Sequence, residues 1–140
     1  MFKFYSKGCE YVLWALVHAP EDQEQGNFSA GDICRKAKVS EASTRKSLQA
    51  LVRVGILEAV SGPQGGYRLA KSSRDIPLLD IIKAVDGENF SNHCVMGFLR
   101  CNEKHPCPLH DTWKILKGHM IEKMNSATLH QLMAALHERK

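Results

Sequence analysis

Residues 29–69 read SAGDICRKAKVSEASTRKSLQALVRVGILEAVSGPQGGYRL, a stretch in which amphipathic segments alternate with turn signals. Ser29 begins a short helical pattern, and Ser40 begins a longer one, because a serine hydroxyl can cap the first backbone N–H groups of a helix. Two helices joined by three or four residues form the helix-turn-helix pattern. The glycine-rich turn at residues 62–66, between β-compatible segments, predicts a hairpin that follows as a wing.

The rest of the chain is predicted to be helical apart from one segment. Apolar spacing predicts helices over residues 6–18 and 76–85, and a long C-terminal helix interrupted near Asn125. We therefore expect a mainly α fold with a small β-hairpin, in which a winged helix-turn-helix domain (residues 1–74) precedes a sensor loop (91–110) and dimerisation helices within residues 75–140. The apolar stripe that predicts a contact with a second subunit consists of Trp113, Leu116, Met120 and Met124.

Length and composition bound the class of protein. A chain of 140 residues, 44% of them hydrophobic, suits one compact domain with an appended helical element. No stretch approaches the roughly 20 apolar residues that span a bilayer, and no secretory signal is recognised at the N-terminus, so we expect a cytoplasmic protein that does not contact a membrane. Phosphate-loop, G-x-S-x-G and H-E-x-x-H motifs do not occur, which argues against an enzyme.

Basic residues are concentrated in the predicted winged helix. Residues 31–74 hold nine Lys and Arg side chains against three acidic ones, whereas the whole chain has a net charge of +4. Such a surface suits the phosphates of double-stranded DNA, although a merely solvated face on a dimerising adaptor has a similar composition. The predicted DNA-binding residues of the recognition helix and the wing are Ser43, Arg45, Lys46, Gln49, Gln64, Gly65, Gly66 and Arg68.

A second signal lies in the segment at residues 91–110, which has little periodicity. Cys94, Cys101, Cys107 and His110 have the spacing C-x6-C-x5-C-x2-H, and thiolates are ligands for both iron–sulfur clusters and zinc. Reversible pairing of two cysteines under oxidation is a third interpretation. Spacing alone leaves cluster, structural zinc and thiol switch open. Cys9 and Cys34 fall within helical patterns, and we expect both to be core residues.

The wing sequence at residues 62–70, the helix around residues 81–85 and the three loop cysteines with His110 together resemble the Rrf2 family of transcription regulators, in its cluster-binding IscR and NsrR branch. The resemblance covers nearly the whole chain. It implies a homodimer with crossing C-terminal helices and a 2Fe–2S or 4Fe–4S cluster held by three cysteines and a further ligand. His110 looks like the histidine ligand of the IscR type. We expect a cluster of this kind to be lost easily during aerobic purification.

The chain differs from that branch at three places. Ser61 stands where many members have arginine before the wing glycine, and Arg45-Lys46 stands where the IscR type has an acidic residue and a glutamine. Cys94 and Cys101 are one residue further apart than in the IscR type. These differences affect the residues that set target preference, site switching and cluster type, so none of the three is carried over from that branch. We expect that gain, loss or oxidation of the cluster reorganises residues 91–110 and thereby moves the recognition helices.

Overall fold

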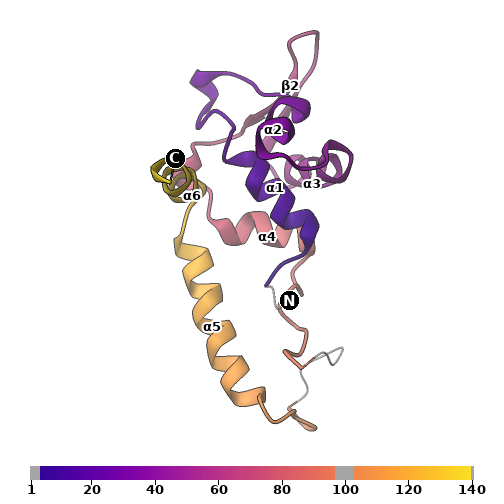
Figure 1. The fold of residues 1–140 in the computed structure, drawn as a ribbon, viewed down its shortest axis with the longest axis vertical. Helices are drawn as coiled ribbons and strands as arrows, with labels where there is room; N and C mark the ends of the chain where they lie inside the picture. Colours follow the sequence, from indigo (N-terminus) through magenta and orange to yellow (C-terminus); the bar gives the residue numbers. More distant parts are fainter. Residues whose placement is uncertain (1–3, 97–102, 140) are drawn as a thin grey trace.

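The computed structural model describes residues 4–96 and 103–139, and its secondary structure is mainly helical with one hairpin (Figure 1). In chain order the elements are α1 (Lys7–Leu16), the 3-10 turn η1 (Gln23–Gln25), α2 (Ala30–Ala37), α3 (Glu41–Arg53), β1 (Leu57–Val60), β2 (Gly66–Leu69), the 3-10 turn η2 (Ser73–Asp75), α4 (Leu78–Asp86), α5 (His110–Ser126) and α6 (Leu129–Glu138). The predicted winged helix-turn-helix with a long C-terminal helix is confirmed.

The helix boundaries follow from local chemistry. Ser29 and Ser40 cap α2 and α3, and their hydroxyls accept hydrogen bonds from the backbone N–H groups of Asp32 and Ser43 at 3.0 and 3.2 Å. Between these helices Lys38 adopts a left-handed conformation with φ of 59°, which reverses the chain. Gly87 ends α4 with φ of 91°, a conformation that favours glycine. The two serine caps are the helix starts that the sequence predicts.

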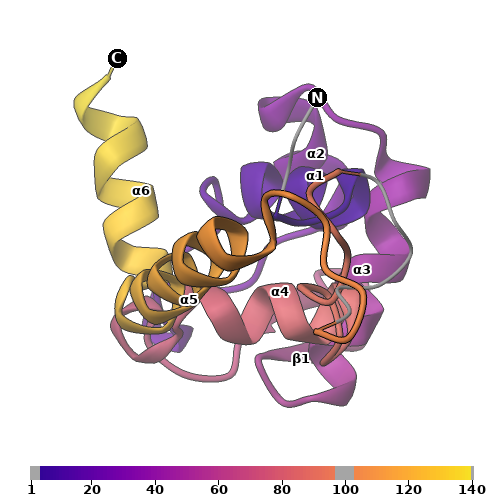
Figure 2. The ribbon, with the colours of Figure 1, turned by 90° about the horizontal axis from the view of Figure 1, so that it is seen from below.

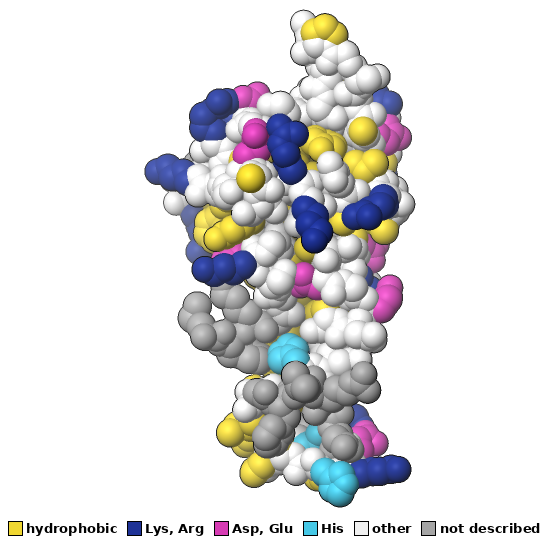
Figure 3. Space-filling view, turned by 90° about the vertical axis from the view of Figure 1, so that its right-hand side faces the viewer, with side chains coloured by type: hydrophobic (Ala, Val, Ile, Leu, Met, Phe, Trp, Pro, Cys, Tyr) yellow, Lys and Arg dark blue, Asp and Glu magenta, His cyan; other side chains and the backbone are white. Residues whose placement is uncertain are grey.

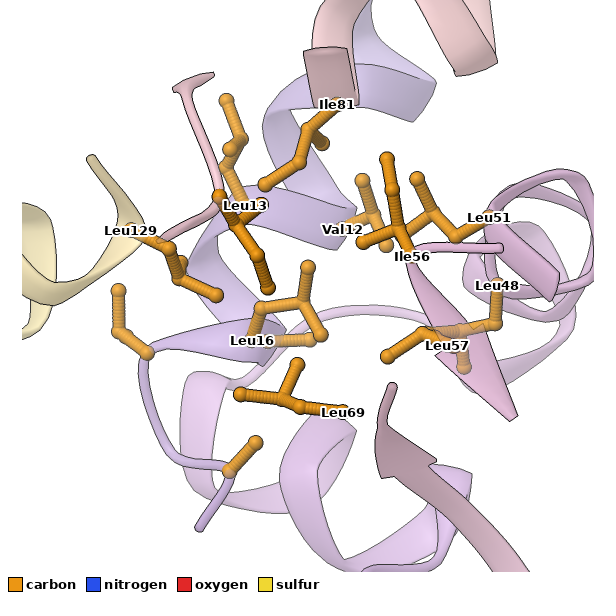
Figure 4. Close-up of a cluster of buried hydrophobic side chains, with 14 of the residues drawn as sticks. Val12, Leu13, Leu16, Leu48, Leu51, Ile56, Leu57, Leu69, Ile81 and Leu129 are labelled. Carbon is orange, nitrogen blue, oxygen red and sulfur yellow. The ribbon is translucent and has the colours of Figure 1, made fainter. Parts of the chain in front are cut away.

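One hydrophobic core joins α1, α3, the hairpin, α4 and α6 (Figure 4). Leu16 of α1 belongs to the same cluster as the hairpin residues Leu57 and Leu69, and all three side chains are fully buried or nearly so. Ile81 of α4 and Leu129 of α6 close the same cluster. The core therefore holds the recognition helix, the wing and the C-terminal helices as one packed unit.

The wing is anchored at its base by a third extended segment. β1 and β2 are antiparallel, with Leu57 opposite Leu69 and Val60 opposite Gly66. Phe28 forms a bridge with Tyr67, in which each backbone N–H donates to the other carbonyl at 2.8 Å. Gly66 has φ of 141°, and a Cβ placed there would lie 2.3 Å from the Phe28 carbonyl oxygen. Gly66 is thus required for this close approach.

Helix α5 extends along the molecule and away from the core. Figures 1 and 2 show that its first turn lies at the opposite end of the long axis from the wing, whereas its last turn meets α6 beside α4. The Leu78 N–H donates to the Ala127 carbonyl at 2.9 Å, and the Leu129 N–H donates to that of Ile76 at 2.9 Å, which fixes this junction. Within the described ranges, no helix is long and apolar enough to span a membrane.

Candidate functional site

The outer face of α3 presents the predicted recognition residues. Its buried side is formed by Thr44, Ser47, Leu48 and Leu51. The Thr44 hydroxyl donates a hydrogen bond to the Ser40 carbonyl at 2.7 Å, so this buried polar group has a hydrogen-bond partner. The exposed side chains are those that a groove-reading helix needs at its leading half, namely Ser43, Arg45, Lys46 and Gln49.

A hollow of about 400 Å³ separates the start of α3 from the wing. It is lined by the first turn of α2, by Glu41 and Arg45 of α3, and by Gly65 and Gly66. An ion pair of 3.4 Å joins the Glu41 carboxylate to the Arg45 guanidinium, and both side chains are more than two-fifths exposed. Such a pair adds little stability in water. It does orient Arg45 along the helix.

The predicted wing residues differ in their position and contacts. Gln64 lies at the exposed tip, and Gly65 and Gly66 lie where the hairpin returns toward α2. Arg68 instead pairs across the hairpin, its Nε donating to the Glu58 carboxylate at 2.7 Å. The sequence did not predict this pairing, because the hairpin register that places Glu58 opposite Arg68 depends on the turn. Arg68 must leave Glu58, or share it, to contact a phosphate.

Several Lys and Arg side chains lie on the side of the molecule on which α3 lies. Figure 3 shows several Lys and Arg side chains distributed over its upper part, with Asp and Glu side chains among them, and His side chains near its lower end. The wing projects at the top of the same view. This arrangement matches the basic excess of residues 31–74 and gives α3 and the wing a common surface toward a polyanion.

The segment that joins α4 to α5, residues 87–109, contains the predicted metal ligands and is called the cysteine loop here. Cys94 is buried and Cys107 is half-buried, and their sulfur atoms lie 3.5 Å apart. The Met96 backbone N–H donates to the Cys94 sulfur at 3.4 Å. The structure thus brings together two of the four predicted ligands.

The spacing of the two sulfurs suits a shared metal atom. Two thiolates bound to one tetrahedral metal ion at about 2.3 Å each lie about 3.8 Å apart. Both zinc and the iron of iron–sulfur clusters accept such a sulfur pair, and a backbone N–H directed at a sulfur stabilises its thiolate. The donor set therefore fits a thiolate-held metal centre, and the geometry of this one pair does not distinguish zinc from iron.

The other two predicted ligands are Cys101 and His110. Cys101 lies outside the described residues. His110 is 7% exposed at the first position of α5, and its backbone N–H donates to the Cys107 carbonyl at 3.1 Å. Among residues 4–96 and 103–139, no group of three His, Cys, Asp or Glu side chains is gathered closely enough to hold a metal ion. A complete four-ligand site therefore stays a prediction.

Trp113 and Lys114 attach the two arms of the cysteine loop to α5. Trp113 is 3% exposed, and its indole N–H donates to the His93 carbonyl at 3.1 Å. Its ring centroid lies 5.7 Å from that of His93 and 5.4 Å from that of Phe4. On the other arm, Lys114 donates to the Glu103 carboxylate at 2.6 Å, and this contact lowers the pKa of Glu103. The loop is thus attached to the first turns of α5 on both sides.

The start of the described chain connects the cysteine loop to the recognition helix. Phe4 contacts Trp113, as described above. Ser6 caps α1 and also bonds Asp86, the last residue of α4 before the loop, through its backbone N–H at 2.8 Å and through its hydroxyl. Ser47 of α3 donates to the Gly8 carbonyl at 3.4 Å. Residues 4–8 therefore touch α5, α4 and α3, and we call them the N-terminal junction.

The remaining two cysteines are core residues, as predicted. Cys9 and Cys34 are 0% and 1% exposed. Burial, with a smaller effect from the Asp86 carboxylate, raises the pKa of the Cys9 thiol to about 12. Burial also raises the pKa of Cys34. Since the thiolate is the reactive form of cysteine, neither side chain is suited to metal binding or redox chemistry.

A basic recognition helix, a glycine wing and a long helix beside a cysteine loop define a winged helix-turn-helix transcription regulator. The sequence profile of the Rrf2 family, described as "Iron-dependent Transcriptional regulator", matches residues 5–135. The chain therefore belongs to the Rrf2 family. It is a DNA-binding transcription regulator and not an enzyme.

Two relatives and two solved structures illustrate the similarity. The chain is 28% identical to the transcriptional regulator IscR of Pectobacterium carotovorum over 128 residues, which is 91% of this chain and 77% of that protein. It is also 28% identical to IscR of Vibrio campbellii over 131 residues, 94% of this chain and 77% of the relative.

Among structures, CymR, the global cysteine regulator of B. subtilis, has a TM-score of 0.77 at 22% identity and covers 96% of this chain and 98% of its own. IscR of T. potens has a TM-score of 0.75 at 24% identity, with 99% and 91% covered.

Proposed function

We propose that this regulator binds double-stranded DNA with an affinity set by an iron–sulfur cluster in the cysteine loop. The observation that carries the proposal is the 3.5 Å approach of the Cys94 and Cys107 sulfurs on a loop that follows α4 and is attached to the first turns of α5. The proposed ligands are Cys94, Cys101, Cys107 and His110. When bound, the cluster supplies electron-transfer chemistry and sensitivity to oxidants.

The proposed DNA contacts divide by position. Ser43, Arg45, Lys46 and Gln49 project from the exposed face of α3 and read base edges in the major groove. Gln64 and the glycine backbone of the wing contact the sugar–phosphate chain or the minor groove. Arg68 contributes after exchanging Glu58 for a phosphate, because a carboxylate partner at 2.7 Å is one that a phosphate can replace.

The N-terminal junction supplies the physical connection between the two sites. Ordering of the cysteine loop acts on α4 at Asp86 and on α5 at Trp113, and both residues contact the junction. The junction in turn contacts α3 through Gly8 and Ser47. A change in the loop thus alters the position or rigidity of α3 through contacts within one chain.

The functional unit in this proposal is a homodimer. Helix α5 leaves Ile115, Leu116 and Met120 exposed by 62%, 56% and 41%, and Trp14 of α1 is 53% exposed. Beside them, a mainly apolar groove of about 630 Å³ runs between α1, α4, α5 and α6. A second copy fits this surface, because the exposed apolar side chains of α5 can pack against the same side chains of a second chain related by a two-fold axis. Two α3 helices would then reach half-sites about 34 Å apart.

Leu116→Glu tests the dimer. We expect the variant to fold, since Leu116 is exposed, but to sediment as a monomer and to lose about 10²- to 10⁴-fold in affinity for a two-half-site duplex. The matched control is Asn125→Glu, which places the same charge on the opposite side of α5, because the helix has about 3.6 residues per turn. A dimeric Leu116→Glu variant with unchanged DNA affinity would refute this assignment.

Anaerobic purification followed by metal and sulfide analysis tests the cofactor. The proposal predicts iron with acid-labile sulfide and visible absorbance, all absent from a Cys107→Ser variant that retains the wild-type circular dichroism. Zinc without sulfide would show that the loop binds a structural metal ion and not an iron–sulfur cluster. Preparations that take up neither metal, even after reconstitution under reducing conditions, would refute the metal centre altogether.

A further inference from the structure

The contact between Cys94 and Cys107 has a second chemical meaning. Their sulfurs lie 3.5 Å apart as thiols, whereas a disulfide bond has a length of about 2.05 Å. The two sulfurs need to approach by only about 1.5 Å, a shift within the reach of side-chain rotation. These two cysteines are therefore placed to react with each other.

Protein contacts hold the two cysteines in this position. The carbonyl of His93, the residue before Cys94, accepts the hydrogen bond of the buried Trp113 indole at 3.1 Å. The Cys107 carbonyl accepts from the His110 backbone N–H at 3.1 Å. Both attachments belong to the first turns of α5, so the pair stays together when no metal is bound.

The two sulfurs differ in exposure, which assigns their roles. Cys94 is only 4% exposed, while Cys107 is half-buried in the turn before α5. A small oxidant dissolved in water reaches Cys107 first. Cys94 is then the nearby thiol that resolves the oxidised sulfur, since access as well as thiolate content controls such reactions.

We propose that Cys94 and Cys107 form a reversible disulfide when the metal-free protein meets hydrogen peroxide. The Cys107 thiolate attacks one peroxide oxygen, the O–O bond breaks, and hydroxide leaves and takes up a proton as water. The Cys94 sulfur then attacks the resulting sulfenic acid, so that the S–S bond forms and a second water leaves with the Cys94 proton. Two thiols are oxidised, one peroxide is reduced, and an added dithiol reverses the change.

The disulfide closes the metal site as a consequence, a point that rests on the proposed function. It removes two of the four proposed ligands and encloses Cys101 in the loop between them. Oxidised protein then cannot accept a metal until it is reduced. The cysteine loop has three states in this scheme, namely loaded, reduced without metal, and oxidised.

Peptide mapping of the full-length, metal-free, reduced protein tests the proposal. One equivalent of hydrogen peroxide is added anaerobically, remaining thiols are alkylated in acid, and the protein is digested with trypsin. Cleavage after Arg100 and Lys104 places Cys94, Cys101 and Cys107 on three separate peptides. We expect a loss of about 2 Da, a cross-link between the Cys94 and Cys107 peptides, and an alkylated Cys101 peptide.

Two serine variants provide the matched comparison. Cys101→Ser should form the same cross-link to the same extent as the wild type, and Cys94→Ser should form none. A wild-type cross-link through Cys101, or one between two subunits, would overturn the proposal, and this mapping stands even where a variant fails to fold. Because it uses metal-free protein, it is decided separately from the cluster: a cross-link without any cluster uptake refutes the proposed function alone, and cluster uptake without the cross-link refutes this inference alone.

Discussion

The winged helix and the cysteine loop of this chain are held together by different forces. Leu16, Leu48 and Leu51 are fully buried in a core that extends from α1 to the hairpin. The contacts that attach the described part of the cysteine loop to α5 include the indole hydrogen bond of Trp113, the exposed ion pair of Lys114 and a ring contact with His93. Apolar burial stabilises the first region in any state of the protein. In the proposed function, the second region also responds to what its cysteines bind, which is the property a sensing element needs.

The largest expected effect on stability comes from a substitution in the core of the winged helix. Leu48→Ala removes a fully buried side chain from α3 and should lower the free energy of unfolding by about 2–5 kcal/mol. The loss should be the same for metal-free and loaded protein, because Leu48 belongs to the winged helix. Urea unfolding measures it, with the exposed neighbour Gln49→Ala as control. A loss confined to loaded protein would show that the winged helix also depends on the metal.

A smaller effect is expected at the base of the wing. Gly66→Ala places a Cβ about 2.3 Å from the Phe28 carbonyl oxygen at φ of 141°, so the bridge between Phe28 and Tyr67 should break. We expect a cost of about 1–3 kcal/mol together with weaker DNA binding. Gly62→Ala is the matched control, since it has φ of 99° but no atom within 4 Å of the added Cβ. Equal losses in the two variants would contradict the anchoring role of the bridge.

The smallest expected effect on stability comes from two N-cap substitutions, and these distinguish the two regions most clearly. Ser6→Ala and Ser29→Ala each remove a helix N-cap and should each cost about 1 kcal/mol in thermal or urea unfolding. Only Ser6 also bonds Asp86 at the end of α4. Ser6→Ala should therefore reduce the ratio of DNA affinities between loaded and metal-free protein, whereas Ser29→Ala should preserve it. An unchanged ratio in Ser6→Ala would remove the N-terminal junction from the mechanism.

Local chemistry made much of the winged helix predictable. Ser29 and Ser40 mark helix starts through hydroxyl chemistry that acts within three residues, and Gly87 marks an end through its own backbone freedom. The burial of Cys9 and Cys34 followed from their places in amphipathic patterns. These features depend on neighbours along the chain.

Contacts between distant residues were not predictable in this way. The bridge between Phe28 and Tyr67 and the bond between Ser6 and Asp86 join segments whose approach depends on the packing of the whole fold. The spacing of the three loop cysteines gave each of them the same predicted role. It could not indicate that Cys94 and Cys107 meet through their attachment to α5. The candidate metal site was therefore predicted as a set of residues but not as a geometry.

The DNA affinity of one protein preparation in two states is the most direct measurement of cluster control. Anaerobic fluorescence anisotropy, at fixed salt and pH, would compare loaded and metal-free protein on one duplex selected from genomic fragments. The account predicts that the two dissociation constants differ by about 5- to 150-fold, and that Cys107→Ser binds like metal-free protein. Equal constants for the loaded and metal-free wild type would contradict it.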